Sequence, residues 1–166
     1  MTWSEFLEWV NDSAVGSAIR EGATSFAWIE ATHVLMITTV LGTIAIVDLR
    51  LLGYPAHRRG ARQLIKDMLP FTWVAFVLAV VTGVLLFTSN ALNYWDSNPF
   101  RWKMIALVLA GLNMAVFHLT AYRNIAEWDD SLPPPTIARV AGITSLGLWI
   151  LVVFLGRWIG FSAPMV

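Results

Sequence analysis

Four long runs of apolar residues, separated by short polar segments, dominate the chain. They cover residues 26–52, 69–89, 100–122 and 136–161. A helix rises roughly 1.5 Å per residue, so about 20 apolar residues cross a hydrocarbon core about 30 Å thick. Each run reaches that length. The pattern therefore predicts an all-α polytopic membrane protein, with four transmembrane helices bundled in a single membrane domain.

A different pattern precedes the first run. Between residues 2 and 21, apolar side chains recur at helical spacing while acidic side chains lie elsewhere on the helical wheel. This amphipathic pattern predicts an interfacial helix, lying on the bilayer or packed over the bundle. A second short turn is expected to start at Asp12 or Ser13, since either side chain can cap it. No basic segment followed by a short apolar one is present, so no cleavable signal peptide is expected.

The polar links also set boundaries and orientation. Pro70 is expected in the first turn of the second span, where a missing N–H is tolerated. The first and third loops carry more basic residues than the segments on the opposite side of the bundle. Loops rich in basic residues face the cytoplasm. We therefore expect a multi-pass protein of the bacterial inner membrane with both termini in the periplasm. The basic positions are 50, 58, 59, 62, 66, 123 and 139 on one side, against 20, 101, 103 and 157 on the other.

Composition excludes several classes of function. Hydrophobic residues make up 57% of the chain and charged residues 13%, a balance that a soluble domain cannot hide in one core. Net charge is zero and no basic patch is laced with aromatics, so a nucleic-acid partner is not expected. The absence of cysteine excludes disulfides, c-type haem and cysteine-ligated iron–sulfur clusters. No nucleophile–base pair or phosphate loop appears, so a stand-alone enzyme is not favoured.

Ionisable residues inside the apolar runs are the candidate functional positions, because such groups cost several kcal/mol in lipid unless they are paired, hydrated or used. Five of them are singled out as candidate site residues: Glu30, His33, Lys103, His118 and Arg157. Helical rise separates His33 from His118 by roughly 17 Å along the membrane normal. The two imidazoles therefore cannot ligate one haem iron, although their spacing suits two cofactors stacked across a membrane.

One interpretation makes His33 and His118 ligands of b-type haem, with Lys103 and Arg157 near the propionates. A two-fold dimer could supply the same histidine twice. Within one chain, the candidate second ligands are Met104, Met114 and His57.

Two other interpretations concern the cluster of Glu30, His33, Lys103 and Arg157 alone. These residues could form a structural ion-pair network that fixes helix register. They could instead bind the head group of a quinone and manage its protons. Copper or proton handling is a weaker alternative, because the methionines are too scattered for a soft-metal path.

Other polar and small residues have simpler interpretations. Asp48 is expected to anchor the first helix, paired with Arg123 or Lys66, while Arg50 reaches the headgroups. Asn113 could hydrogen-bond between helices. Tryptophans near the predicted interfaces, Trp128 among them, indicate an aromatic belt. Small residues that could permit close helix approach are Gly42, Ala45, Gly111, Ala115, Gly142 and Ser145.

Several short motifs resemble a family of small four-helix bacterial inner-membrane proteins, classed only as a domain of unknown function. The motifs are Glu30-Ala-Thr-His33, Asp48-Leu-Arg50-Leu-Leu52, Pro99-Phe100-Arg-Trp-Lys103, Asn113 with Phe117-His118, and Gly156-Arg157-Trp158-Ile159. The resemblance covers nearly the whole chain and implies the fold, the membrane location and attention to the five ionisable residues named above. More loosely, the architecture is similar to four-helix b-type cytochromes and to copper-resistance membrane proteins.

Together these patterns favour a small membrane subunit that binds b-type haem or quinone and transfers electrons within or beside a larger complex. Its expected partners are lipid and other membrane subunits or further copies of itself. The alternative is a non-catalytic accessory subunit, whose buried polar residues only fix helix packing and partner contacts.

Overall fold

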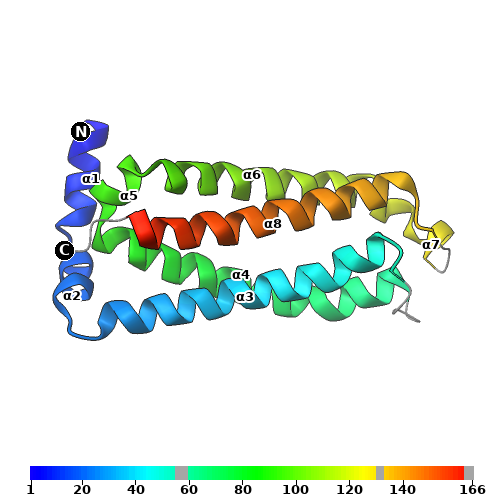
Figure 1. Ribbon diagram of the computed structural model, residues 1–166, viewed down its shortest axis with the longest axis horizontal. Coiled ribbons are helices and arrows are strands. Elements are labelled where there is room, and N and C mark those ends of the chain that lie inside the picture. Colours follow the sequence, from blue (N-terminus) through cyan, green and yellow to red (C-terminus); the bar gives the residue numbers. More distant parts are fainter. Residues whose placement is uncertain (55–59, 130–132, 163–166) are drawn as a thin grey trace.

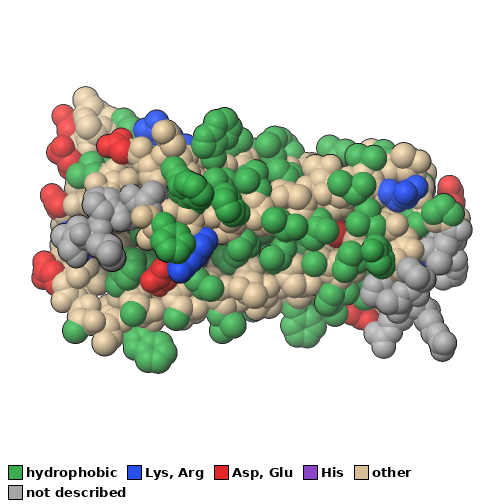
Figure 2. Space-filling view, in the orientation of Figure 1, with side chains coloured by type: hydrophobic (Ala, Val, Ile, Leu, Met, Phe, Trp, Pro, Cys, Tyr) green, Lys and Arg blue, Asp and Glu red, His purple; other side chains and the backbone are tan. Residues whose placement is uncertain are grey.

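Four long helices form the body of the protein. The computed structural model describes residues 1–54, 60–129 and 133–162. Within these ranges, four helices are long and apolar enough to cross a membrane, and no strand is present. Most charged side chains gather at the two ends of the bundle (Figure 2). The predicted all-α four-helix bundle is thus confirmed, built from α3 (Ser25–Leu51), α4 (Ala61–Ser89), α6 (Asn98–Leu119) and α8 (Thr136–Ser162).

Short helices close both ends of this bundle (Figure 1). At one end lie α1 (Trp3–Asn11), α2 (Ala14–Glu21) and α5 (Ala91–Asp96). The opposite end carries the 3-10 turn η1 (Tyr122–Asn124) and α7 (Ile125–Trp128). We refer to these as the α1 end and the α7 end.

The amphipathic segment forms two helices that lie across the α1 end, nearly perpendicular to the bundle (Figure 1). Ser13 caps α2, because its Oγ accepts the Gly16 N–H at 3.1 Å. Ser13 is one of the two residues predicted for this role. Arg20 donates to the Ser89 carbonyl at 2.7 Å and so ties α2 to the end of α4. Of the two expected placements, packing over the bundle is the one observed.

The start of α4 differs from the prediction. The helix begins at Ala61, which puts Pro70 well inside it rather than in its first turn. The residues before Pro70 are helical partly because the Asp129 carboxylate accepts the Arg62 N–H at 2.7 Å. This capping group comes from a segment far along the chain, so the local pattern could not reveal it.

The prediction that Trp128 belongs to an aromatic belt is wrong. Its side chain is buried and donates to the Ala121 carbonyl.

Three of the four possible helix seams are closed. Helix α3 packs along α4, α6 along α8, and α3 against α8, whereas α4 and α6 make almost no backbone contact in the described ranges. The α3–α8 seam depends on Gly142, where a Cβ would lie 3.1 Å from the Asp48 carbonyl. The predicted close approach at Gly42 and Gly111 is wrong, since a Cβ at either meets nothing within 4 Å.

Candidate functional site

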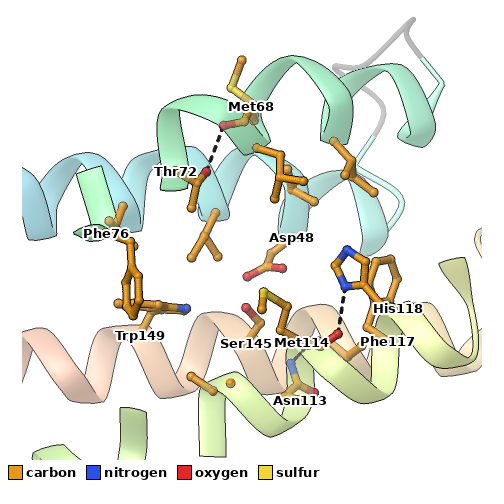
Figure 3. Close-up of a pocket in the computed structure, with 18 of the residues that line it drawn as sticks. Asp48, Met68, Thr72, Phe76, Asn113, Met114, Phe117, His118, Ser145 and Trp149 are labelled. Atoms are coloured by element: carbon orange, nitrogen blue, oxygen red, sulfur yellow. Dashed lines mark hydrogen bonds between the residues drawn. The ribbon is translucent and has the colours of Figure 1, made fainter. Parts of the chain in front are cut away.

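The four long helices enclose a cavity of about 170 Å³ in the half of the bundle toward the α7 end (Figure 3). Its wall is mostly apolar, and four aromatic side chains contribute to it: Trp73, Phe76, Phe117 and Trp149. Five polar side chains interrupt this surface, namely Asp48, Thr72, Asn113, His118 and Ser145. The cavity lies between α4 and α6, whose backbones make almost no contact in the described ranges.

Asp48 of α3 is the acidic member of this wall. Its side chain is only 4% exposed, and the Ser145 hydroxyl of α8 points toward it (Figure 3). The Oδ2 atom has no hydrogen-bond partner among the described residues, and none of their cations lies within 4 Å of it. The predicted pairing of Asp48 with Arg123 or Lys66 is therefore wrong. A buried carboxyl without such a partner is available to a ligand.

Arg50 also differs from its predicted role. It is 3% exposed, and its Nη2 donates to the Asp129 carbonyl at 2.8 Å. The side chain therefore holds Asp129, the first residue after α7, against α3 instead of reaching lipid headgroups. The prediction failed because the sequence gives no sign that Asp129 lies beside the end of α3.

His118 of α6 is the basic member of the cavity wall. Its Nδ1 lies 2.9 Å from the Met114 carbonyl, and its ring contacts those of Phe117 and Tyr122. A carbonyl oxygen only accepts, so we assign the hydrogen of the neutral ring to Nδ1. The lone pair of Nε2 then remains available. His118 and Asp48 thus bring two proton acceptors, from different helices, to one apolar cavity (Figure 3).

Two other polar side chains of the wall have structural partners. The Asn113 amide donates to the Ala141 carbonyl at 3.0 Å, linking α6 to α8 as predicted. The Thr72 hydroxyl donates to that of Thr43 at 2.8 Å and links α4 to α3. These bonds fix the helices around the cavity.

His33 lies in the other half of the bundle and faces α4. Its Nδ1 is 2.9 Å from the Ala79 carbonyl and 3.0 Å from the Thr82 hydroxyl. Gly83 makes room for the ring, since a Cβ there would lie 3.0 Å from Cε1. Nδ1 therefore carries the hydrogen, leaving Nε2 as an acceptor, and Lys103 is near enough to interact electrostatically with the ring.

The predicted ion-pair network around His33 is not formed. Among the described residues, no ion pair within 4 Å joins Glu30, His33, Lys103 and Arg157. The Arg157 guanidinium instead lies 4.6 Å from the centre of the Phe161 ring, while His33 bonds to α4. These residues share a depth, but two of them are directed to other neighbours, so their charges do not pair.

The described residues do not form a two-ligand haem site. His118 lines the cavity with Asp48 and Leu51 near the α7 end, whereas His33 bonds to Ala79 and Thr82 in the other half of the bundle, so the two imidazoles lie at different depths. Met114 precedes His118 by one turn on the same helix, so it cannot take the opposite axial position. Met104 is exposed on the bundle surface, and His57 falls outside the described residues. No group of three potential metal-ligating side chains exists in the described part of the chain.

Fold and cavity define a four-helix membrane-spanning protein with a carboxyl and an imidazole in an apolar interior. Comparison with known families is consistent with this class. The chain belongs to the family of unknown function DUF6644, whose model matches residues 6–162. This confirms the resemblance to an uncharacterised family, whereas the looser similarity to b-type cytochromes and copper-resistance proteins has no support. No curated protein and no solved structure matches the chain.

Sequence reasoning overlooked part of the cavity wall. The sequence pattern predicts only an anchoring role for Asp48 and gives no role to Trp73 and Trp149, although all three line the cavity. Trp149 lies near the middle of α8, far from either predicted interface. A tryptophan at mid-membrane depth can be recognised in the sequence. It indicates a role other than anchoring at the membrane interface, which explains only tryptophans near the helix ends.

Proposed function

We propose that this protein is a redox-associated membrane subunit whose internal cavity binds the ring of a quinol. The observation that supports it is the pair of acceptors, Asp48 Oδ2 and His118 Nε2, facing one apolar, aromatic cavity. A quinol ring is flat, has two apolar faces and carries hydroxyl donors at its edge. Aromatic walls suit the faces, and the two acceptors suit the hydroxyls.

The arrangement supports oxidation of the bound quinol. One hydroxyl donates to His118 Nε2 and the other to Asp48 Oδ2. As two electrons leave, to one flavin or one after the other to haem or iron–sulfur centres of a partner subunit, both O–H bonds break and these two side chains take the protons. The products are the quinone, two protons and two electrons, so the step balances. Reduction of a quinone is the same step in reverse.

The open seam between α4 and α6 supports a lipid-soluble ligand. The cavity has about 170 Å³, which suits a head-group ring rather than a whole drug-sized molecule. An apolar tail would leave the bundle between α4 and α6, where the helix backbones stay apart. In this proposal the protein sits in the bacterial inner membrane beside a larger redox complex.

Tryptophan fluorescence tests the proposal directly, because Trp73 and Trp149 line the cavity. We expect a decyl-tailed benzoquinol to quench the fluorescence of the purified protein saturably. Asp48→Asn and His118→Gln should each weaken binding about tenfold, since each removes an acceptor of a proton. The matched control is His33→Gln, an imidazole in the other half of the bundle, which should leave binding unchanged.

Two results would contradict this proposal. One is the absence of saturable quenching by either the quinol or the quinone in the wild-type protein. The other is equal loss of binding in the His33→Gln control, which would point to a general change in the bundle. A Trp149→Phe variant offers a second measurement, because it should reduce the quenching amplitude without changing the affinity more than about twofold.

Haem b at His33 is the second candidate. His33 Nδ1 donates to a backbone carbonyl, and such a bond orients imidazoles that ligate iron. Lys103 lies near the ring and could pair with a haem propionate. Natively purified protein should then show a Soret band that His33→Ala removes. If neither quinol binding nor a Soret band is found, the accessory-subunit alternative is favoured, for which the Asn113 and Thr72 bonds already supply a rationale.

A further inference from the structure

A second cavity, of about 710 Å³, opens at the α7 end between the first turns of α4 and the residues Tyr122 and Asp129. Its wall comes from the first turns of α4, from Tyr122 of η1 and from Asp129. The α4 residues that line it are Arg62, Gln63, Ile65, Lys66, Leu69, Pro70 and Trp73. We propose that this cavity binds the head group of an anionic phospholipid.

The charges of the cavity fit a phosphate. Arg62 and Lys66 are exposed and lie four residues apart, so they share one face of α4. The one carboxylate in the wall, Asp129, accepts the Arg62 N–H at 2.7 Å and so faces the start of α4. Gln63 is also engaged, donating to Asp67. Arg62 and Lys66 both line the cavity, where a phosphate diester can accept hydrogen bonds from both.

The polarity of the wall changes in the direction that a lipid requires. Helix α4 has 29 residues, or roughly 43 Å of rise, and exceeds a hydrocarbon core about 30 Å thick. Its first two turns therefore extend into the headgroup region, and they carry Arg62 and Lys66. Deeper along the same wall lie Leu69, Pro70 and the exposed ring of Trp73. A lipid with its phosphate beside Arg62 and Lys66 and its acyl chain against Trp73 would match this change from polar to apolar wall.

The volume also fits this ligand. Ligand sites usually span about 300–1,000 Å³, and the cavity lies within that range. It shares the lining residues Ile65, Leu69 and Trp73 with the inner cavity. The lipid site does not depend on the quinol proposal, because none of its charged groups belongs to the inner cavity.

Native mass spectrometry of the detergent-purified full chain tests the inference. With equimolar phosphatidylglycerol and phosphatidylcholine, the wild type should retain the anionic lipid preferentially. Each basic residue near a membrane surface contributes roughly fivefold in affinity. The Arg62→Gln/Lys66→Gln double variant should therefore bind phosphatidylglycerol about 25-fold more weakly. Arg62→Lys/Lys66→Arg should retain the preference, which separates loss of charge from loss of fold.

The matched control is Arg101→Gln, which removes an exposed cation at the α1 end that lies 3.6 Å from Asp96. This variant should bind as the wild type does. Equal retention of both lipids by the wild type would overturn the inference, as would an equal loss in the control. Displacement of the lipid by millimolar glycerol phosphate would also overturn it, because the site would then recognise a free phosphate rather than a lipid.

Discussion

Polar side chains that line the interior of the bundle divide into two kinds in this protein. Those of Asn113 and Thr72 are hydrogen-bonded to neighbouring helices and hold the bundle together. In contrast, Asp48 Oδ2 has no partner among the described residues although it is buried. Natural proteins satisfy most buried polar groups. Unsatisfied atoms beside a cavity therefore indicate where a ligand binds, while satisfied ones indicate where stability resides.

The Asn113→Ala variant tests the structural kind. It removes the bond to the Ala141 carbonyl, and such bonds between membrane helices contribute about 1 kcal/mol. We expect the free energy of unfolding to fall by that amount in sodium dodecyl sulfate titrations. The control is Asn93→Ala, an exposed amide on α5, which should change little. Equal effects of the two substitutions would refute the assignment.

Tyr94 of α5 predicts a pH dependence. Burial and then the Glu30 carboxylate raise the pKa of its phenol above the usual value of about 10. The neutral phenol is thus favoured in the folded state, so its stabilisation is complete below about pH 10 and is lost as the pH rises toward the folded-state pKa. We expect the unfolding midpoint of the wild type to fall above about pH 10. Tyr94→Phe should remove this component, whereas Tyr54→Phe, at an exposed phenol, should retain it.

At the scale of elements, the packing of the helix pairs creates the cavity. Helix α3 approaches α8 closely at Gly142, while α4 and α6 stay apart. One tight seam opposite one open seam leaves space between the four helices at the level of Asp48. Small residues alone did not indicate which seam would close, because Gly42 and Gly111 face open space.

Gly142→Ala tests the tight seam. The added Cβ would meet the Asp48 carbonyl at 3.1 Å and the Leu51 Cβ at 3.2 Å, so the helices must separate. Overpacking of this kind typically costs about 1–3 kcal/mol. Gly147→Ala is the control on the same helix, where nothing lies within 4 Å, and its higher helix propensity should stabilise by up to about 1 kcal/mol. Thermal unfolding in detergent should thus move in opposite directions, and a shift of the same sign would count against the α3–α8 contact.

At the scale of the whole molecule, the two ends have different characters. The α1 end is covered by helices that lie across the bundle, and the α7 end carries the basic start of α4 (Figure 1). The excess of basic residues around the α7 end is the basis of the predicted orientation, with that end in the cytoplasm.

Absence of native cysteine makes this orientation directly measurable. In intact bacteria with a permeabilised outer membrane, we expect a membrane-impermeant maleimide to label Ala23→Cys, which is exposed at the α1 end. It should label Ala126→Cys, exposed on α7, only after the inner membrane is broken. The reverse order of labelling would show that the basic-residue rule has misplaced the termini.

The sequence alone determined the four apolar helices, the amphipathic helical segment before them and the family, because apolar length and helical periodicity are local properties of the chain. It also located the polar residues at depth and separated His33 from His118, since helical rise is constant. Only the tertiary structure decided which of these groups meet. The partners of Asp48, Arg50 and His33 depend on how each helix is rotated and which seam closes, and this rotation is set by packing between helices rather than by any one of them.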